Sequence, residues 1–197
     1  MDSEEQGRRS VGARRNMRSA DAILEAAEAV LLENGYGGFS IEAVARRARA
    51  GKPTIYRWWP NKAALLLDVY HRQKRHAGQA DTGDLERDIE TFLCDLLRLW
   101  RDTTLGSIFR SMVAEAQSDA GAQAALADYM SDRRRHTGAI VERAKARGEV
   151  AEDISSDLVA DLLASFAWGR LLTNRLDDGE DMKNAARILA DGIRKRS

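Results

Sequence analysis

Apolar residues recur at helical spacing along most of the 197-residue chain, with polar residues at the positions between them. Ala and Leu are abundant, only two prolines are present, and no stretch shows the strict alternation of a half-buried strand. The pattern therefore predicts an all-α protein. The expected helices span residues 19–34, 41–48, 52–59, 62–77, 85–100, 105–113, 122–147, 157–175 and 180–195.

Residues 40–62 are typical of two short helices joined by a tight turn. Ser40 is a suitable N-cap for the first short helix, and Asn61 is a suitable N-cap for the longer helix that follows the pair. Gly51 lies in the turn between the two short helices. Pro53 lies early in the second short helix, and Pro60 ends it. Two short helices, a turn and a capped third helix form a helix-turn-helix signature.

The second short helix carries the chemistry of a DNA contact. Its hydrogen-bonding and basic side chains are Lys52, Thr54, Tyr56 and Arg57. Lys and Arg neutralise phosphates, while Thr and Arg also reach base edges in a major groove. Ile55 and Trp59 lie four residues apart, so we expect both to face inward and hold the helix on its neighbours.

The segment GKPTIYRWWPNKAALL resembles the recognition-helix segment of the tetracycline-repressor (TetR) family of transcriptional regulators, and the resemblance covers about residues 19–75. It departs at Arg49, where the family usually has glycine. An Arg at positive φ costs about 1 kcal/mol, so either the turn differs slightly in shape or a phosphate contact of Arg49 offsets the strain. The expected DNA-contact residues are Ser40, Arg49, Lys52, Pro53, Thr54, Tyr56, Arg57 and Lys62, with Ser40 and Lys62 on phosphates.

The net charge of zero hides an asymmetry between the two parts of the chain. Residues 1–75 hold 14 Lys and Arg against 9 Asp and Glu, a net of +5, and the remainder holds 17 against 22, a net of −5. The basic part contains the helix-turn-helix, which favours nucleic-acid binding by that part alone. An ordinary solvated charge distribution would be the alternative interpretation without the motif.

Composition also limits the setting and the domain organisation. A single cysteine, Cys94, excludes an internal disulfide and suits a reducing cytoplasm, and neither a secretory signal nor a membrane-spanning apolar run is present. We expect a disordered basic arm over 1–17, a helix-turn-helix domain with a connecting helix over 18–77, and a helical domain over 84–197. The Gly- and Asp-containing stretch 78–84 is the expected linker.

The helical domain is expected to have two functions that the family resemblance implies, besides forming a core. One is binding of a small-molecule effector of unknown identity between helices. Its candidate lining residues, for most of which core packing is the simpler interpretation, are Phe92, Leu96, Trp100, Phe109, Met112, Met130 and Phe166.

The second implied function is homodimerisation through the last two helices. Helix 157–175 is apolar on more than one face, and more apolar surface than one neighbour covers indicates a further partner. The candidate interface residues are Leu158, Leu162, Phe166, Gly169, Leu172, Ala185, Ile188 and Leu189. A dimer would address two half-sites of a near-palindromic operator in double-stranded DNA, about 34 to 36 Å apart.

An enzyme is not indicated. His71 and His76 are five residues apart, a poor spacing for a shared metal on one helix, and no GxSxG, P-loop, GxGxxG or HExxH motif is present. No cofactor or metal is expected. The favoured hypothesis is a transcriptional regulator, a repressor released from its operator by an effector. The alternative is an all-helical ligand-binding or interaction protein whose helix-turn-helix no longer reads DNA.

Overall fold

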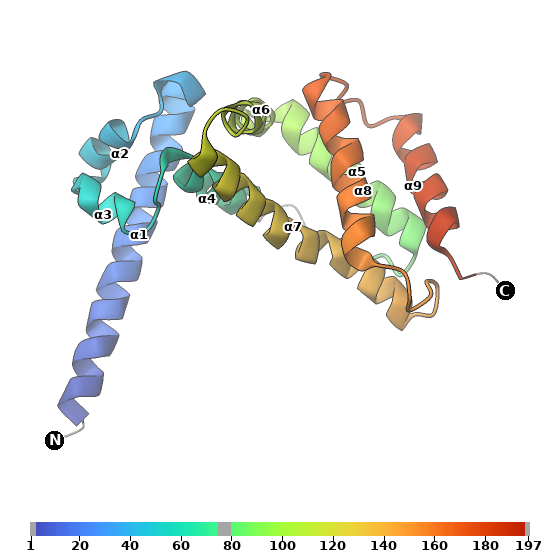
Figure 1. The fold of residues 1–197 in the computed structure, drawn as a ribbon, viewed down its shortest axis with the longest axis horizontal. Helices are drawn as coiled ribbons and strands as arrows, with labels where there is room; N and C mark the ends of the chain where they lie inside the picture. Colours follow the sequence, from blue (N-terminus) through green and yellow to red (C-terminus); the bar gives the residue numbers. More distant parts are fainter. Residues whose placement is uncertain (1–2, 75–79, 196–197) are drawn as a thin grey trace. The chain divides into compact units, whose positions relative to one another are not determined.

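The computed structural model describes residues 3–74 and 80–195, with side chains described for 19–73 and 80–195. The described residues form nine α-helices and no β-strand, apart from one isolated bridge between Val150 and Arg194 (Figure 1). The helices are α1 (Ser3–Gly38), α2 (Ile41–Ala48), α3 (Lys52–Tyr56), α4 (Lys62–Lys74), α5 (Leu85–Asp102), α6 (Leu105–Glu115), α7 (Ala120–Ala146), α8 (Ser156–Leu172) and α9 (Glu180–Ile193). The predicted all-α class is confirmed.

Most helix ends lie where local signals predicted them. The bounds of α2 coincide with the expected 41–48, whereas α3 ends at Tyr56, before the expected end at 59. The backbone N–H groups of Trp58 and Trp59 still donate to the Ile55 carbonyl at 2.9 Å, so the chain continues as turns up to Pro60. Helix α8 ends before the expected residue 175 because Asn174 adopts a φ of 56°.

The first helix differs from its prediction. It begins at Ser3, whereas we expected a disordered arm over 1–17 and a helix start at Ser19 or Asp21. The arm contains helix-favouring Arg, Glu and Ala and no proline, so its sequence permits the helix to extend toward the N-terminus. Near its other end α1 is interrupted at Gly35, whose φ of 63° and ψ of −174° are non-helical, so the chain kinks where the helix was expected to end.

Two compact units divide the chain, and their boundary differs from the expected linker. The first unit comprises residues 1–73 and 114–126, and the second comprises 74–113 and 127–197. The expected linker over 78–84 lies partly outside the described residues. The end of α6 and the first turns of α7 therefore belong with the helix-turn-helix rather than with the helical domain.

Packing of small apolar residues explains why 114–126 joins the first unit. Ala63 of α4 is buried together with Ala116 and Ala122, and Leu126 packs against this cluster. Short side chains let these helices approach closely, and the Asn61 side chain lies against Gly121 so tightly that a Cβ there would meet its Nδ2 at 2.9 Å. The phenolic hydroxyl of Tyr36 donates to the Glu115 carboxylate in the same unit.

The second unit is organised around α5, which packs against α8 and α9. The buried apolar face of α5 comprises Leu85, Ile89, Leu93, Leu96, Leu97 and Trp100. Arg170 of α8 is 4% exposed, and its guanidinium donates to Asp177 at 2.7 Å and to Asp181 at 3.1 Å. These ion pairs fix the segment that connects α8 to α9.

Candidate nucleic-acid interface

Helix α2 is fixed at its N-terminus and along its inner face. The Ser40 hydroxyl accepts a hydrogen bond from the Ala43 N–H at 3.1 Å, which confirms Ser40 as the N-cap. Ile41 is 5% exposed and Val44 is fully buried, so the helix is anchored on the first unit's core. A helix held at these points provides a rigid support for the helix that follows.

The turn between α2 and α3 passes through Arg49 in the left-handed region. Arg49 has φ 49° and ψ 38°, as expected if it occupies a position that usually takes glycine. The Arg49 N–H donates to the Arg46 carbonyl at 3.3 Å, and the Ala50 N–H donates to the Ala45 carbonyl at 3.0 Å. These bonds satisfy the carbonyls at the end of α2 and keep the turn tight.

Helix α3 separates an inner face from an outer one. Ile55 is fully buried and Trp59 is 4% exposed, which confirms both as inward-facing residues. The Trp59 indole N–H donates to the Asp68 carboxylate at 2.7 Å, so the end of α3 is fastened to α4. Lys52, Tyr56 and Arg57 are exposed, and Thr54 is half-buried between the two faces.

Trp58 is an exposed aromatic residue of this segment that the sequence analysis did not assign. Its exposed fraction is 40%, compared with 48% for Tyr56. Trp58 follows α3 in a turn in which its backbone N–H donates to the Ile55 carbonyl at 2.9 Å. The exposure of Trp58 could have been predicted from the sequence. Trp59 was expected to face inward, and adjacent residues of a helix point in different directions.

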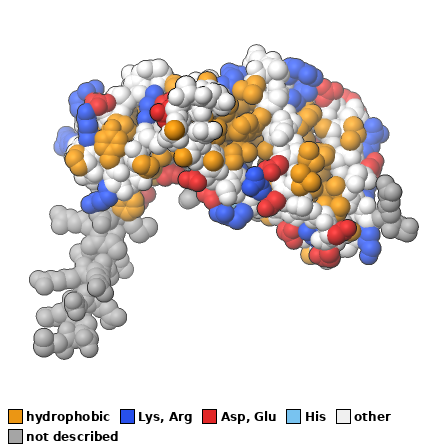
Figure 2. Space-filling model, in the orientation of Figure 1, with side chains coloured by type: hydrophobic (Ala, Val, Ile, Leu, Met, Phe, Trp, Pro, Cys, Tyr) orange, Lys and Arg blue, Asp and Glu red, His pale blue; other side chains and the backbone are white. Residues whose placement is uncertain are grey.

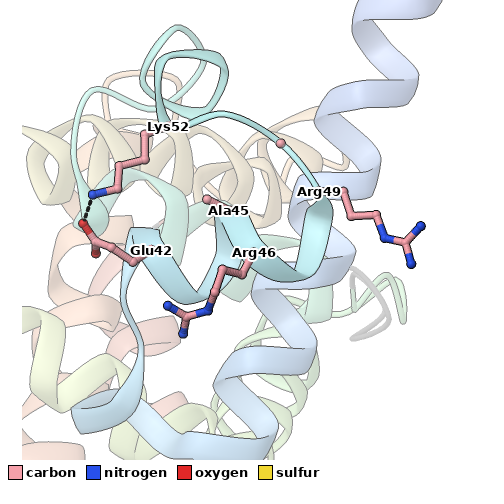
Figure 3. Close-up of a pocket in the computed structure, with 6 residues that line it drawn as sticks. Glu42, Ala45, Arg46, Arg49 and Lys52 are labelled. Atoms are coloured by element: carbon pink, nitrogen blue, oxygen red, sulfur yellow. Dashed lines mark hydrogen bonds and ion pairs between the residues drawn. The ribbon is translucent and has the colours of Figure 1, made fainter.

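The Lys52 side chain is engaged by α2. Its ammonium group forms an ion pair with the Glu42 carboxylate, and the hydrogen bond from Lys52 lowers the pKa of that carboxyl (Figure 3). The two side chains point toward one another between α2 and α3, whereas Arg49 points away from the pair (Figure 3). All of them line one pocket together with Arg46. The surface around Glu42 thus carries three basic side chains and one acid.

The start of α4 confirms one predicted cap and changes the setting of Lys62. The Asn61 side chain accepts from the Ala64 N–H at 2.8 Å, as an N-cap should. The Lys62 ammonium lies 4.3 Å from the centre of the Tyr36 ring, and burial lowers the pKa of Lys62. Lys62 is therefore half-buried against an aromatic face rather than fully exposed.

The candidate effector residues of the second unit divide into core and partly exposed positions. Leu96, Trp100, Phe109 and Met112 are buried, while Phe92, Met130 and Phe166 are half-buried. The Trp100 and Phe109 rings stack with centroids 5.8 Å apart. Phe109 also meets Tyr129 at 5.8 Å and Trp168 at 5.2 Å, two aromatic residues that the sequence analysis did not include.

The candidate dimer residues of α8 and α9 include four large apolar side chains open to solvent. Leu158, Leu162, Leu172 and Ile188 are 60%, 48%, 53% and 68% exposed. Gly169 is also exposed, and Phe166, Ala185 and Leu189 are half-buried. Hydrophobic side chains are visible on the surface over α8 (Figure 2). Such apolar surface on a folded chain is typical of an interaction face.

The fold and this site define a helix-turn-helix DNA-binding protein: two short capped helices, a tight turn, and an outward face of basic, hydroxyl and aromatic side chains. No helix in the described part of the chain is long and apolar enough to cross a membrane. The described residues also contain no group of three or more His, Cys, Asp or Glu side chains that could hold a metal ion.

Comparison with known proteins identifies the family. Residues 23–69 match the family model described as bacterial regulatory proteins, tetR family, and residues 79–188 match the tetracyclin repressor-like C-terminal domain. The chain is 33% identical over 171 residues to the DNA-binding transcriptional repressor TetR of Mycobacteroides abscessus, covering 84% of this chain and 88% of that protein. It is 30% identical over 153 residues to the uncharacterized HTH-type transcriptional regulator YdeS of Bacillus subtilis, covering 77% of each.

A solved structure shows the same fold. The TetR family transcription regulator SCO0332 matches with a TM-score of 0.78 at 28% identity, covering 89% of this chain and 98% of that chain. This chain belongs to the TetR family of bacterial transcriptional regulators. It is a DNA-binding regulator, and its family is one of regulators rather than enzymes.

Proposed function

We propose that this protein is a homodimeric repressor that binds a near-palindromic operator and releases it when a small molecule binds the second unit. In each subunit α3 enters a major groove, where Thr54, Tyr56 and Arg57 meet bases and phosphates. Ser40, Arg49, Pro53 and Lys62 flank this contact and face the DNA backbone. Trp58 extends the same surface with an aromatic contact to sugar or to a thymine methyl group.

The outward face of α3 is the observation that carries the proposal. Burial of Ile55 and Trp59, together with the Trp59–Asp68 hydrogen bond, fixes the orientation of the short helix. The remaining side chains are then exposed on a rigid support, as direct readout requires. Lys52 can contact a DNA phosphate only after its ammonium group has left the ion pair with Glu42.

Dimerisation is supported by the four exposed apolar residues of α8 and α9. A two-fold axis would bring these faces of two copies together and would present two reading heads to two half-sites. Release by an effector is supported by the chain path, since α6 and α7 each contribute residues to both units. An effector acts if it binds more tightly to a conformation that does not fit the operator.

The test is binding of the purified protein to DNA that flanks its own coding region, measured by fluorescence anisotropy at two salt concentrations. A repressor that makes about six phosphate contacts should lose on the order of a thousandfold in affinity between 50 and 200 mM salt. It should also prefer the flanking DNA over a scrambled duplex. Failure on flanking DNA and in a random-sequence selection would contradict the proposal.

A further inference from the structure

A cleft of about 730 Å³ opens on the second unit at the end of α5, the start of α6 and the connection from α8 to α9. Its volume is within the range of about 300–1,000 Å³ that small-molecule sites occupy. Trp100 and Leu176 are among its lining residues and are 4% and 9% exposed. They are the apolar part of its lining, while the polar lining residues come from the end of α5, the α5–α6 link, α6 and the α8–α9 connection.

The acids of the cleft are already paired. Asp178 accepts from Arg101 at 2.7 Å and also from Arg98, and these hydrogen bonds lower its pKa to about 2. Asp177 accepts from Arg170 at 2.7 Å. The charge that either carboxylate presents to a ligand is therefore largely offset by a neighbouring guanidinium.

Arg110 is the exception among the arginines around the cleft. Its guanidinium forms no ion pair within the residues that the structure describes, and one of its terminal nitrogens contacts two neutral oxygens. These are the Leu171 carbonyl and the Asn174 side-chain oxygen, both at 3.3 Å, beyond the usual hydrogen-bond range of about 2.7–3.2 Å. A guanidinium has five N–H donors, so several remain for a ligand.

Asn174 complements Arg110. Its amide oxygen accepts from Arg110, so its side-chain NH₂ group remains a donor beside the guanidinium. Asn174 has a φ of 56°, a conformation that Asn and Asp adopt more readily than most residues. The backbone thus holds this amide in the lining of the cleft, next to a guanidinium that has no acidic partner among the described residues.

We propose that this cleft binds a small organic carboxylate, whose anionic group bonds to Arg110 and the Asn174 amide and whose apolar body covers Trp100 and Leu176. Arg110 supplies the bidentate donor geometry that suits a carboxylate. Under the proposed function this carboxylate would be the effector, which gives the effector its chemical class. Binding of the carboxylate does not depend on that function; only the release of the operator that would follow rests on it.

The first test is isothermal titration of the full-length protein, without DNA, using benzoate, 2-naphthoate and decanoate as probes and 2-naphthamide as the neutral counterpart of naphthoate. At least one carboxylate should bind saturably and more tightly than the amide. Arg110→Gln should raise its Kd by about tenfold or more. Arg135→Gln, which removes an exposed guanidinium of α7 outside the cleft, should leave the Kd unchanged.

Asn174→Asp provides a second, independent test. It places a carboxylate within reach of Arg110 while keeping a side chain that tolerates the left-handed backbone. The tethered acid should replace the ligand's anionic group, so carboxylate binding should fall by at least the same factor and the melting temperature should not fall. Sedimentation of each variant would show that the oligomeric state is unchanged.

The inference is overturned if none of the carboxylates binds, if they bind no better than the amide, or if Arg110→Gln and Asn174→Asp bind them like wild type. Adding the tightest-binding carboxylate to a complex of the protein with its operator then tests whether ligand binding releases the DNA. Release of DNA by wild type but not by Arg110→Gln supports an effector site. Failure of the protein to bind any DNA would contradict the proposed function while leaving the titration result intact.

Discussion

At the scale of the residue, Arg49 combines an unfavourable backbone conformation with a basic side chain. A non-glycine residue at φ 49° costs about 1 kcal/mol relative to glycine. The strain lies in the turn between α2 and α3, beside the face proposed to contact DNA. A contact between the Arg49 guanidinium and a phosphate would explain why the strained residue is present.

We predict that Arg49→Gly stabilises the protein by about 1 kcal/mol and weakens operator binding. Arg46→Gly is the matched control, because Arg46 has the same side chain in a helical conformation and its replacement should destabilise by about 1 kcal/mol. Urea unfolding at fixed protein concentration measures the stability of both variants, and fluorescence anisotropy on the operator measures the DNA affinity of Arg49→Gly. An Arg49→Gly variant no more stable than wild type would show that the turn stores no strain.

Tyr56 is the most exposed aromatic side chain on the proposed reading face. Its replacement by alanine should cost about 1–3 kcal/mol of operator binding, roughly 5- to 150-fold in Kd. Leu32→Ala is the control, since Leu32 is 63% exposed on α1 and lies outside the reading face. Anisotropy on the selected operator measures affinity, and unchanged affinity of Tyr56→Ala would mean that the assigned face is wrong.

At the scale of the element, helix ends were predictable wherever a neighbouring side chain closes them. Ser40 and Asn61 cap α2 and α4 within three residues of their own positions, so the sequence alone identified them. The assignment of 114–126 to the first unit was not predictable, because it depends on Ala116 and Ala122 meeting Ala63. Alanines in an amphipathic helix do not indicate which helix they will meet.

Asp178 links two elements, since Arg98 and Arg101 of α5 both donate to this residue of the α8–α9 connection. These hydrogen bonds lower its pKa from 3.8 to about 2 in the folded protein. The folded state therefore disfavours the protonated form, and the stabilising contribution is complete above pH 3.8 and is lost as the pH falls toward 2.

We predict that Asp178→Asn lowers the urea midpoint at pH 7 and that the difference from wild type shrinks as the pH falls below 3.8. The control is Asp132→Asn, because Asp132 is exposed and pairs only with Arg135 on its own helix among the described residues. It should change the midpoint little at any pH. A pH-independent effect of Asp178→Asn would show that charge is not the cause.

At the scale of the whole molecule, the apolar faces of α8 and α9 predict the oligomeric state. Burying Leu158 in a dimer contributes about 1.5–3 kcal/mol, and placing an unpaired ammonium there costs more. Leu158→Lys should therefore shift the protein from dimer to monomer in analytical ultracentrifugation and weaken operator binding. Leu32→Lys replaces a leucine of similar exposure on α1, 63% against 60%, and should leave the dimer intact.

Contiguous residues determined the helix-turn-helix, its caps and the separation of inner from outer residues on α3. They were readable because hydrogen bonds and side-chain periodicity within one helix involve residues three or four positions apart. The strained position of Arg49 was indicated only by the family resemblance, in which glycine usually occupies that turn, and the structure gives it a φ of 49°.

Only the tertiary structure decided which side chains from different helices meet. The stacking of Trp100 on Phe109, the pairing of Lys52 with Glu42 and the approach of Arg110 to Asn174 join residues between 9 and 64 positions apart in the chain. Helical spacing shows which face of its own helix each residue occupies. It contains no information about the rotation and position of a neighbouring helix. Those depend on packing of the whole core, which is also what leaves Arg110 without an acidic partner among the residues that the structure describes.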